Sequence, residues 1–207
     1  MRLFDELNSF SEDEILDIDA YFDEMELSEE GKDERKKFAK DMKEIMLFLF
    51  SLFLVMKENS YMDKRFIISQ LQSRYLDLVV EYMKIDKYIE EHIKEFSEET
   101  ADTTLRHIDE EFYLSEDRGV LISINEANNA LNYKDFSDAI ADGKTEKQWI
   151  TEKDQKVRKT HKRLDDVIIP INDTFVVGNT LMRFPHDTLY GIDYKELSNC
   201  RCTIRYV

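Results

Sequence analysis

The sequence is poor in the residues that make tight turns and covalent cross-links. Its 207 residues include only 5 glycines, 2 prolines and 2 cysteines. Few glycines and prolines leave few sharp turns, which favours long helices. Both cysteines belong to one Cys200-Arg201-Cys202 motif, a spacing that disfavours a disulfide between them. The sequence therefore excludes the disulfide framework of a small secreted domain.

The sequence also lacks a basic surplus and a long hydrophobic run. It has 29 basic and 45 acidic residues, a net charge of −16, whereas residues 144–207 alone hold 12 basic and 9 acidic residues. Such an acidic body disfavours broad coating of DNA and leaves only the C-terminal part able to contact phosphate locally. The apolar run 45–56 has 12 residues, against about 20 for a membrane span. We predict no signal peptide and no membrane association.

Most of what the sequence does contain is helical periodicity. In residues 34–57 apolar side chains recur at steps of three and four, which predicts a helix. Residues 62–96 have the same spacing and predict a second long helix. Each stripe must be covered, and the simplest solution is an antiparallel hairpin of the two helices. The alternative is self-association of two copies through this seam. The first stripe consists of Phe38, Met42, Ile45, Leu49, Leu52 and Met56.

Three further helices are predicted before the C-terminal third, over residues 97–113, 120–131 and 133–140. Asp142 and Gly143 end the last of them, since glycine is the usual residue just past a helix end. The acidic stretch 1–30 is either a solvated arm or an arm that docks on a basic partner surface. Residues 114–119 are the best domain boundary, giving an acidic helical region, 1–114, and a smaller module, 115–207.

The C-terminal module is predicted to contain a helix and a small sheet. A cap at Thr151 starts the helix, which runs to about Leu164. Residues 167–171 form a strand that contains Pro170 and therefore lies at an edge. Residues 175–177 and 181–184 flank a Gly-Asn turn and predict a hairpin, and residues 203–207 form the last strand. The expected fold class is α+β, mostly α: a long helical hairpin or bundle followed by helices and a short antiparallel sheet.

Two groups of residues in this module can carry chemistry. Asp154, Arg158 and His161 are spaced to share one face of the predicted helix, where they can form an acid–base set or half a metal site. The same spacing has an explanation without catalysis: Asp154 caps the helix, Asp154 and Arg158 form an ordinary ion pair, and His161 packs over the next turn.

The cysteine motif is the second group. Cys200 and Cys202 are predicted to lie on a strand with both thiols on one side. With His161, and with His186 or Asp187, they can make a four-ligand zinc site. The alternative is a pair of buried structural thiols. Trp149 is interpreted as a core anchor, and we find no phosphate-binding loop or hydrolase signature.

The order of these residues resembles the phage head morphogenesis family, the minor head proteins similar to protein F of phage Mu. The resemblance covers residues 115–207 and rests on K-x-W-x-T-x-x-D-x-x-V-R-x-x-H followed by I-P-I, F-P-x-D and N-C-R-C. At two positions the family usually has glycine, whereas this chain has Asp166 and His186. The main matching residues are Trp149, Asp154, Arg158, His161, Pro185, Asp187, Asn199, Cys200, Arg201 and Cys202.

The resemblance implies a virion component rather than an enzyme. Members of the family are present in few copies, associate with the portal vertex inside the capsid and can leave with the DNA. The implied partners are the portal protein and capsid or scaffold proteins, with local contact to packaged DNA. The implied locations are the capsid interior and, during assembly, the host cytoplasm. The alternatives are a metal-dependent enzyme that uses Asp154, Arg158, His161 and the cysteines, or an injected effector.

Overall fold

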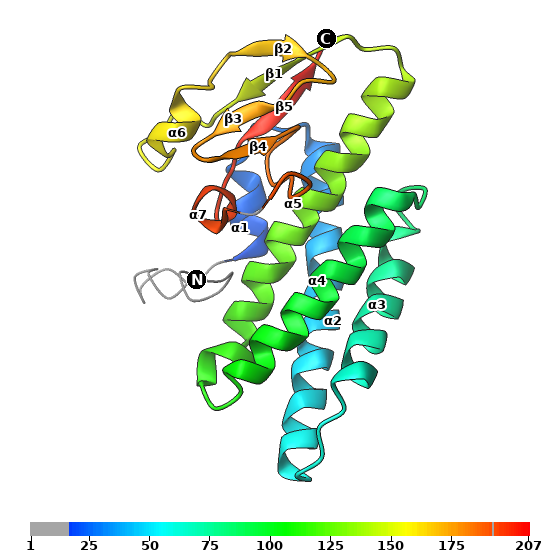
Figure 1. The fold of residues 1–207 in the computed structure, drawn as a ribbon. Coiled ribbons are helices and arrows are strands. Elements are labelled where there is room, and N and C mark those ends of the chain that lie inside the picture. The colour runs from blue at the N-terminus through cyan, green and yellow to red at the C-terminus, as the bar shows by residue number, and fades with distance from the viewer. Residues whose placement is uncertain (1–16, 192) are drawn as a thin grey trace. The chain divides into compact units, whose positions relative to one another are not determined.

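In the computed structural model, which describes residues 17–191 and 193–207, helices dominate and the strands lie in the C-terminal third (Figure 1). The predicted class, α+β and mostly α, is confirmed. The helices are α1 (Ile18–Asp23), α2 (Glu29–Glu58), α3 (Lys64–Val79), α4 (Lys87–Arg106), the 3₁₀ helix η2 (Glu111–Leu114), α5 (Glu116–Ala141), α6 (Lys159–Lys162) and α7 (Tyr194–Leu197). The strands are β1 (Glu146–Ile150), β2 (Ile168–Pro170), β3 (Phe175–Val177), β4 (Thr180–Met182) and β5 (Thr203–Tyr206).

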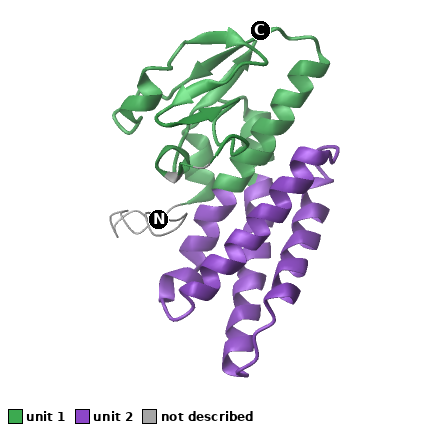
Figure 2. Cartoon of the chain, in the orientation of Figure 1, with its two compact units in different colours: residues 1–10, 17–36, 125–207 green, residues 11–16, 37–124 purple. Residues whose placement is uncertain are grey.

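The described residues divide into two compact units (Figure 2). We call Asp17–Lys36 with Asn125–Val207 the sheet unit, and Lys37–Ile124 the helical unit. Both divisions fall inside helices, within α2 and within α5. The domain boundary expected between residues 114 and 115 coincides with neither division, but the two compact units do not test how far the family-like region extends. It stays a prediction.

The helical unit is built on the apolar face of α2. The predicted helix 34–57 is confirmed, and Phe38 contacts Tyr75 of α3 with their ring centroids 6.4 Å apart. The Arg74 guanidinium lies 3.9 Å from the centroid of the Phe48 ring. Residues early in α2 therefore meet the end of α3, and the expected antiparallel pairing is present.

The predicted single helix over residues 62–96 is wrong, because the chain breaks between α3 and α4. Asp86 ends the break: its side chain accepts a hydrogen bond from the Ile89 backbone N–H at 3.1 Å and caps α4. The apolar spacing runs on through this turn, so periodicity alone does not reveal it. An aspartate in an extended conformation satisfies the free N–H groups of a new helix.

Two other helix boundaries also differ from the prediction. No helix starts at Ser97, which lies inside α4 with its hydroxyl donating to the Ile93 carbonyl at 2.6 Å. The predicted helices 120–131 and 133–140 are one continuous helix, α5, which ends before Gly143 as expected. Gly143 has φ +77°, a left-handed conformation that glycine adopts without steric cost.

The apolar run and the acidic stretch of the N-terminal half are the other two features singled out in the sequence. The apolar run 45–56 lies inside α2, and none of the described helices is both long and apolar enough to cross a membrane. Residues 1–16 of the acidic stretch lie outside the described part of the chain, whose first element is α1, capped by Asp17.

The sheet unit contains a three-stranded antiparallel sheet, in the order β2-β1-β5, and a separate β3-β4 hairpin. The edge strand, the hairpin and the last strand agree with the predictions. The central strand β1 was not predicted. In β1, Lys147 pairs with Ile169 on one side and with Tyr206 on the other. Trp149 is fully buried in the core beside the sheet, which confirms its role as an anchor.

The predicted helix 151–164 is wrong, because only α6 is helical there. The Thr151 N–H and hydroxyl both donate to Asp165 Oδ1 at 3.0 Å, so Thr151 closes a loop instead of capping a helix. Lys153 has φ +55°, which a continuous right-handed helix does not allow. Long-range contacts from Asp165 therefore override the local capping pattern.

Candidate metal centre

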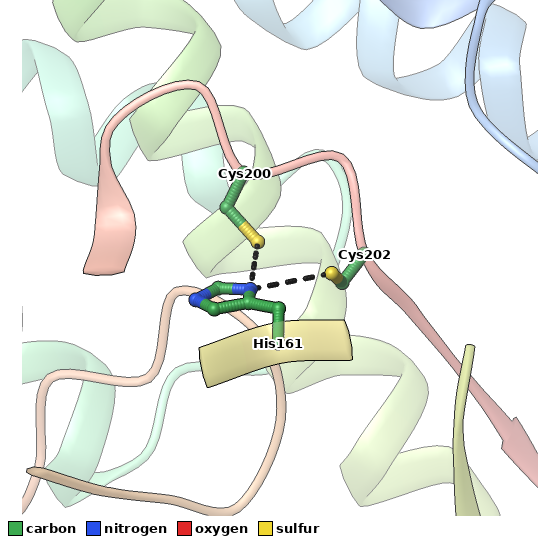
Figure 3. Close-up of side chains that lie close together, drawn as sticks. All are labelled: His161, Cys200 and Cys202. Carbon is green, nitrogen blue, oxygen red and sulfur yellow. Dashed lines mark hydrogen bonds between the residues drawn. The ribbon is translucent and has the colours of Figure 1, made fainter. Parts of the chain in front are cut away.

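His161, Cys200 and Cys202 meet at one buried point of the sheet unit (Figure 3). His161 Nδ1 lies 3.4 Å from Cys200 Sγ and 3.3 Å from Cys202 Sγ. His161 comes from α6, whereas the cysteines lie in the segment that leads into β5. The predicted convergence of the two thiols on His161 is confirmed, although neither cysteine lies within the strand itself.

Glu196 holds the other side of the His161 ring. Its Oε2 lies 3.0 Å from His161 Nε2 and accepts a hydrogen bond from the Thr160 hydroxyl at 2.7 Å. Gly178, in the β3-β4 turn, packs against this carboxylate so closely that an added Cβ would lie 2.3 Å from Glu196 Oε1. The φ of +60° at Gly178 also favours glycine. The turn therefore limits where the Glu196 carboxylate can lie.

The carbonyl of Cys200 is anchored by two further residues. It accepts hydrogen bonds from the Tyr21 hydroxyl at 2.6 Å and from His186 Nε2 at 2.8 Å. The Asn129 side chain in turn donates to the His186 carbonyl at 2.5 Å. His186 thus fixes the backbone of the cysteine motif through Nε2. His186 is not in the group of described residues whose donor atoms lie within 4.8 Å of one another, so the ligand role expected for it stays a prediction that the structure does not support.

The thiols and the imidazole influence one another's protonation. Hydrogen bonds with Cys202 and then with His161 hold the pKa of Cys200 well below its usual range, against the effect of burial. The hydrogen bond with Cys200, together with burial, raises the pKa of Cys202. Burial alone would lower the pKa of His161, but the hydrogen bond and charge of Cys200 outweigh it and raise that pKa. The cluster therefore favours a Cys200 thiolate beside a protonated imidazole.

Asp154, Arg158 and His161 do not form the predicted helix face. Asp154 lies before α6, where its Oδ1 accepts hydrogen bonds from the backbone N–H groups of Lys156 and Val157 at 2.9 and 3.1 Å. Arg158 is the residue that precedes α6, and its guanidinium donates to the Ser198 carbonyl. Because a turn replaces the helix, the three side chains point to different partners and provide no shared acid–base set.

Arg201 links the cysteine motif to two acidic side chains. Its guanidinium donates to Asp154 Oδ2 at 2.5 Å and to Glu24 Oε2 at 2.9 Å. A small pocket is lined by His161 and the two cysteines together with Lys156, Val157, Arg158, Asn199 and Arg201. Asn199 has φ +54°, so the chain turns sharply just before the cysteine motif. The motif residues on this side therefore shape the entrance to the cluster.

Pro185 and Asp187 belong to the loop that carries His186. Asp187 is fully buried and accepts two hydrogen bonds from the Arg183 guanidinium, each 2.8 Å long. The Asn132 side chain donates to the Pro185 carbonyl at 2.8 Å. Asp187 thus braces its own loop, and it is not part of the group of residues that can share an ion with His161.

Sequence reasoning missed four residues that hold the cluster in place: Tyr21, Asn129, Asn132 and Glu196. A signal for two of them exists in α5, where asparagines interrupt an otherwise apolar stretch. Asparagine is a poor helix former, and a buried amide needs hydrogen-bond partners. Several asparagines on one buried helix therefore indicate a polar network. Nothing local marks Tyr21, which lies 179 positions before the residue whose carbonyl it contacts.

The chemistry open to this cluster is that of two thiols and an imidazole. The same donor atoms can hold a metal ion, and a thiolate beside an imidazolium can also react as a nucleophile. Comparison of the chain with models of known protein families, with curated proteins and with solved structures found no match. The resemblance to the phage head morphogenesis family therefore depends on this chain's own residues.

Proposed function

We propose that this chain is a minor head protein of a phage or prophage, acting in head morphogenesis at the portal vertex inside the capsid. One observation carries the proposal. Asp166 and His186 stand where the family usually has glycine, and they have φ angles of +61° and +67°. Left-handed backbone is uncommon for residues other than glycine. Asp166 and His186 thus have the left-handed backbone conformation that favours glycine, the residue that they replace in the family pattern.

The folding of the motif residues supports the same proposal. Trp149, His161 and Asp187 are almost fully buried, as are the two cysteines of the motif. Arg158 and Arg201 make hydrogen bonds within the same unit, Arg158 to the Ser198 carbonyl and Arg201 to Asp154. A spacing pattern whose members join in one compact unit is better explained by a shared fold than by chance matches.

The proposed partners are the portal protein and capsid or scaffold proteins. An acidic body suits docking on a basic partner surface. The segment around α6 presents exposed basic side chains at Lys156, Lys159, Lys162 and Arg163, which suits local contact with the phosphates of packaged DNA. Self-association through the helical seam remains a further proposal. Absence of catalysis stays a prediction.

The direct test is to probe purified virions and proheads for the chain, and to co-purify the full chain with the portal protein. We expect the chain in both particles and in the portal complex. A chain that is missing from virions and proheads contradicts the proposal. The injected-effector alternative makes a separate prediction, because it requires the chain in the material ejected with the DNA.

The proposed DNA contact can be tested independently of assembly. Replacing Lys159 and Lys162 by glutamate should weaken binding of short duplex DNA and flatten its salt dependence, because fewer counterions are released on binding. Replacing Lys87 and Lys94 by glutamate, at two exposed sites of α4, changes the charge by the same amount; it is the matched control and should change neither. Equal weakening by both variants would mean that net charge alone governs binding.

A further inference from the structure

We propose that His161, Cys200 and Cys202 bind one zinc ion through Nδ1 and the two Sγ atoms, and that a fourth coordination position faces the adjoining pocket. The inference concerns the purified chain and does not depend on the proposed role in phage heads. It replaces the four-ligand set expected from the sequence by three protein ligands, with His186 outside the coordination shell.

The distances between the donor atoms fit a tetrahedral ion. Bond lengths of about 2.3 Å to sulfur and about 2.0–2.1 Å to nitrogen place adjacent ligand atoms of a tetrahedron about 3.5 Å apart. The observed separations of Nδ1 from the two sulfur atoms are 3.4 and 3.3 Å. All three donor atoms lie within 4.8 Å of one another. The two nitrogen–sulfur separations are therefore within a few tenths of an ångström of those that an ion requires.

Glu196 supplies the outer contact that a zinc-bound histidine requires. Metal-binding histidines almost always donate their second ring N–H to a carboxylate, a carbonyl or water, which fixes the ring and the tautomer. His161 Nε2 lies 3.0 Å from Glu196 Oε2, and both side chains are largely buried, with 2% and 10% of their surfaces exposed. With Nε2–H held by Glu196, an ion entering the cluster would replace the proton on Nδ1, which is directed at the thiols.

The donor set selects the class of metal. Two thiolates and one imidazole suit zinc, whereas calcium and magnesium prefer oxygen ligands. The nearest carboxylate, that of Glu196, contacts Nε2 on the opposite edge of the ring from the thiols. The group of described residues able to share an ion consists of these three side chains alone.

The fourth position follows from what surrounds the cluster. His186 and Asp187 contact the Cys200 carbonyl and Arg183, and neither belongs to the group of described residues whose donor atoms lie close enough to share an ion. The pocket beside the donors has Lys156 and Arg201 in its lining. Solvent entering this pocket would supply the fourth ligand. The ion would join α6 to the segment before β5 and so tie together parts of the chain about 40 positions apart.

The experiment uses the full chain, expressed with zinc and purified under reducing conditions. We expect one zinc per chain by elemental analysis, and replacement by cobalt should give the visible absorption of a tetrahedral ion together with thiolate charge-transfer bands. Cys200→Ser, Cys202→Ser and His161→Ala should each retain at least tenfold less zinc. The cobalt spectrum needs no variant, so it remains decisive even where a variant fails to fold.

Two controls separate ligands from neighbours. His186→Gln and His107→Ala should keep one zinc per chain, whereas Glu196→Gln should weaken zinc affinity about 10–100-fold without changing the stoichiometry. Loss of zinc in His186→Gln with retained circular dichroism would overturn the three-ligand set. Less than a tenth of one zinc in the folded wild-type chain after dialysis against zinc, or a Cys200–Cys202 disulfide in freshly purified protein, would overturn the site itself.

Discussion

The two compact units differ in what holds them together. The helical unit is stabilised by apolar side chains that recur along each helix, such as Phe38, Leu71 and Ile93. The sheet unit combines a small apolar core around Trp149 with buried polar contacts between distant segments, such as that of Tyr21 with Cys200. Apolar packing tolerates exchanges of similar volume, whereas a buried hydrogen bond depends on both partners. Polar contacts between distant segments are therefore what distinguishes the sheet unit, although the helical unit also buries the Arg118 guanidinium, which donates to Thr104.

The largest effect is expected at the core of the sheet unit. Trp149→Ala should lower the free energy of unfolding by about 3–5 kcal/mol, because a large, fully buried side chain is replaced by a cavity. Denaturant unfolding measures this loss. Val176→Ala, on the exposed side of β3, is the control and should stay within about 0.5 kcal/mol. A loss below about 1 kcal/mol for Trp149→Ala would refute its role as an anchor.

A matched pair tests the apolar face of α2 in the helical unit. Phe53 is fully buried although it lies outside the predicted stripe, whereas Met56 lies in that stripe and is only partly buried. The stripe has a mean step of 3.6 residues, which fits a straight helix, but the buried face of α2 is displaced from it and includes Met46, Phe50 and Phe53. Phe53→Ala should cost about 3–5 kcal/mol and Met56→Ala about 1 kcal/mol or less. Equal losses in thermal unfolding would favour the predicted stripe.

A smaller effect is expected from the polar network of the sheet unit. Asn129→Ala should destabilise the chain by about 1–3 kcal/mol, because it leaves the buried His186 carbonyl without this donor. Asn172→Ala changes the same residue type at an exposed site and should be nearly neutral. Urea unfolding of both variants gives the comparison. If the two losses agree, the buried network contributes nothing measurable.

A further effect is a pH dependence that one buried lysine confers. Lys147 is fully buried between Phe136 and Phe175, and burial lowers its pKa to about 8 despite the opposing effect of Asp187. In the unfolded chain the proton stays bound up to the ordinary pKa near 10.5. Between pH 8 and about 10 unfolding therefore takes up a proton, so stability should rise with pH.

Lys147→Met isolates that contribution. The difference in the free energy of unfolding between the variant and wild type should shrink as the pH rises from about 8 to 10, because wild type alone gains stability. We expect the variant to be at least as stable as wild type at pH 7, since it removes a buried charge. A difference that does not change with pH would mean that the Lys147 ammonium is solvated in the folded chain.

Much of the architecture can be predicted from local patterns. The α2 helix, the β3-β4 hairpin around Gly178 and the edge position of Pro170 follow from apolar spacing and turn chemistry. The break before α4 was missed because its apolar spacing continues across the turn that Asp86 caps.

The site could be predicted only in part. Its ligand types could be identified, because Cys200 and Cys202 are rare residues placed together and His161 belongs to the same motif. The residues around the ligands could not be predicted. The roles of Glu196 and His186 are set by hydrogen bonds to His161 and to the Cys200 carbonyl, and no local spacing in the sequence indicates these bonds. The separation of Asp154 from His161 likewise depends on the Thr151–Asp165 contact, which replaces the expected helix by a loop.

The measurement that tests the central claim most directly is X-ray absorption at the zinc edge of the purified, zinc-loaded full chain. We predict two sulfur atoms at about 2.3 Å and lighter nitrogen or oxygen atoms at about 2.0–2.1 Å from the ion. Cys200→Ser should reduce the sulfur count to one. A shell of nitrogen and oxygen alone, or a sulfur count that Cys200→Ser leaves at two, would contradict the assignment of His161, Cys200 and Cys202 as the ligands.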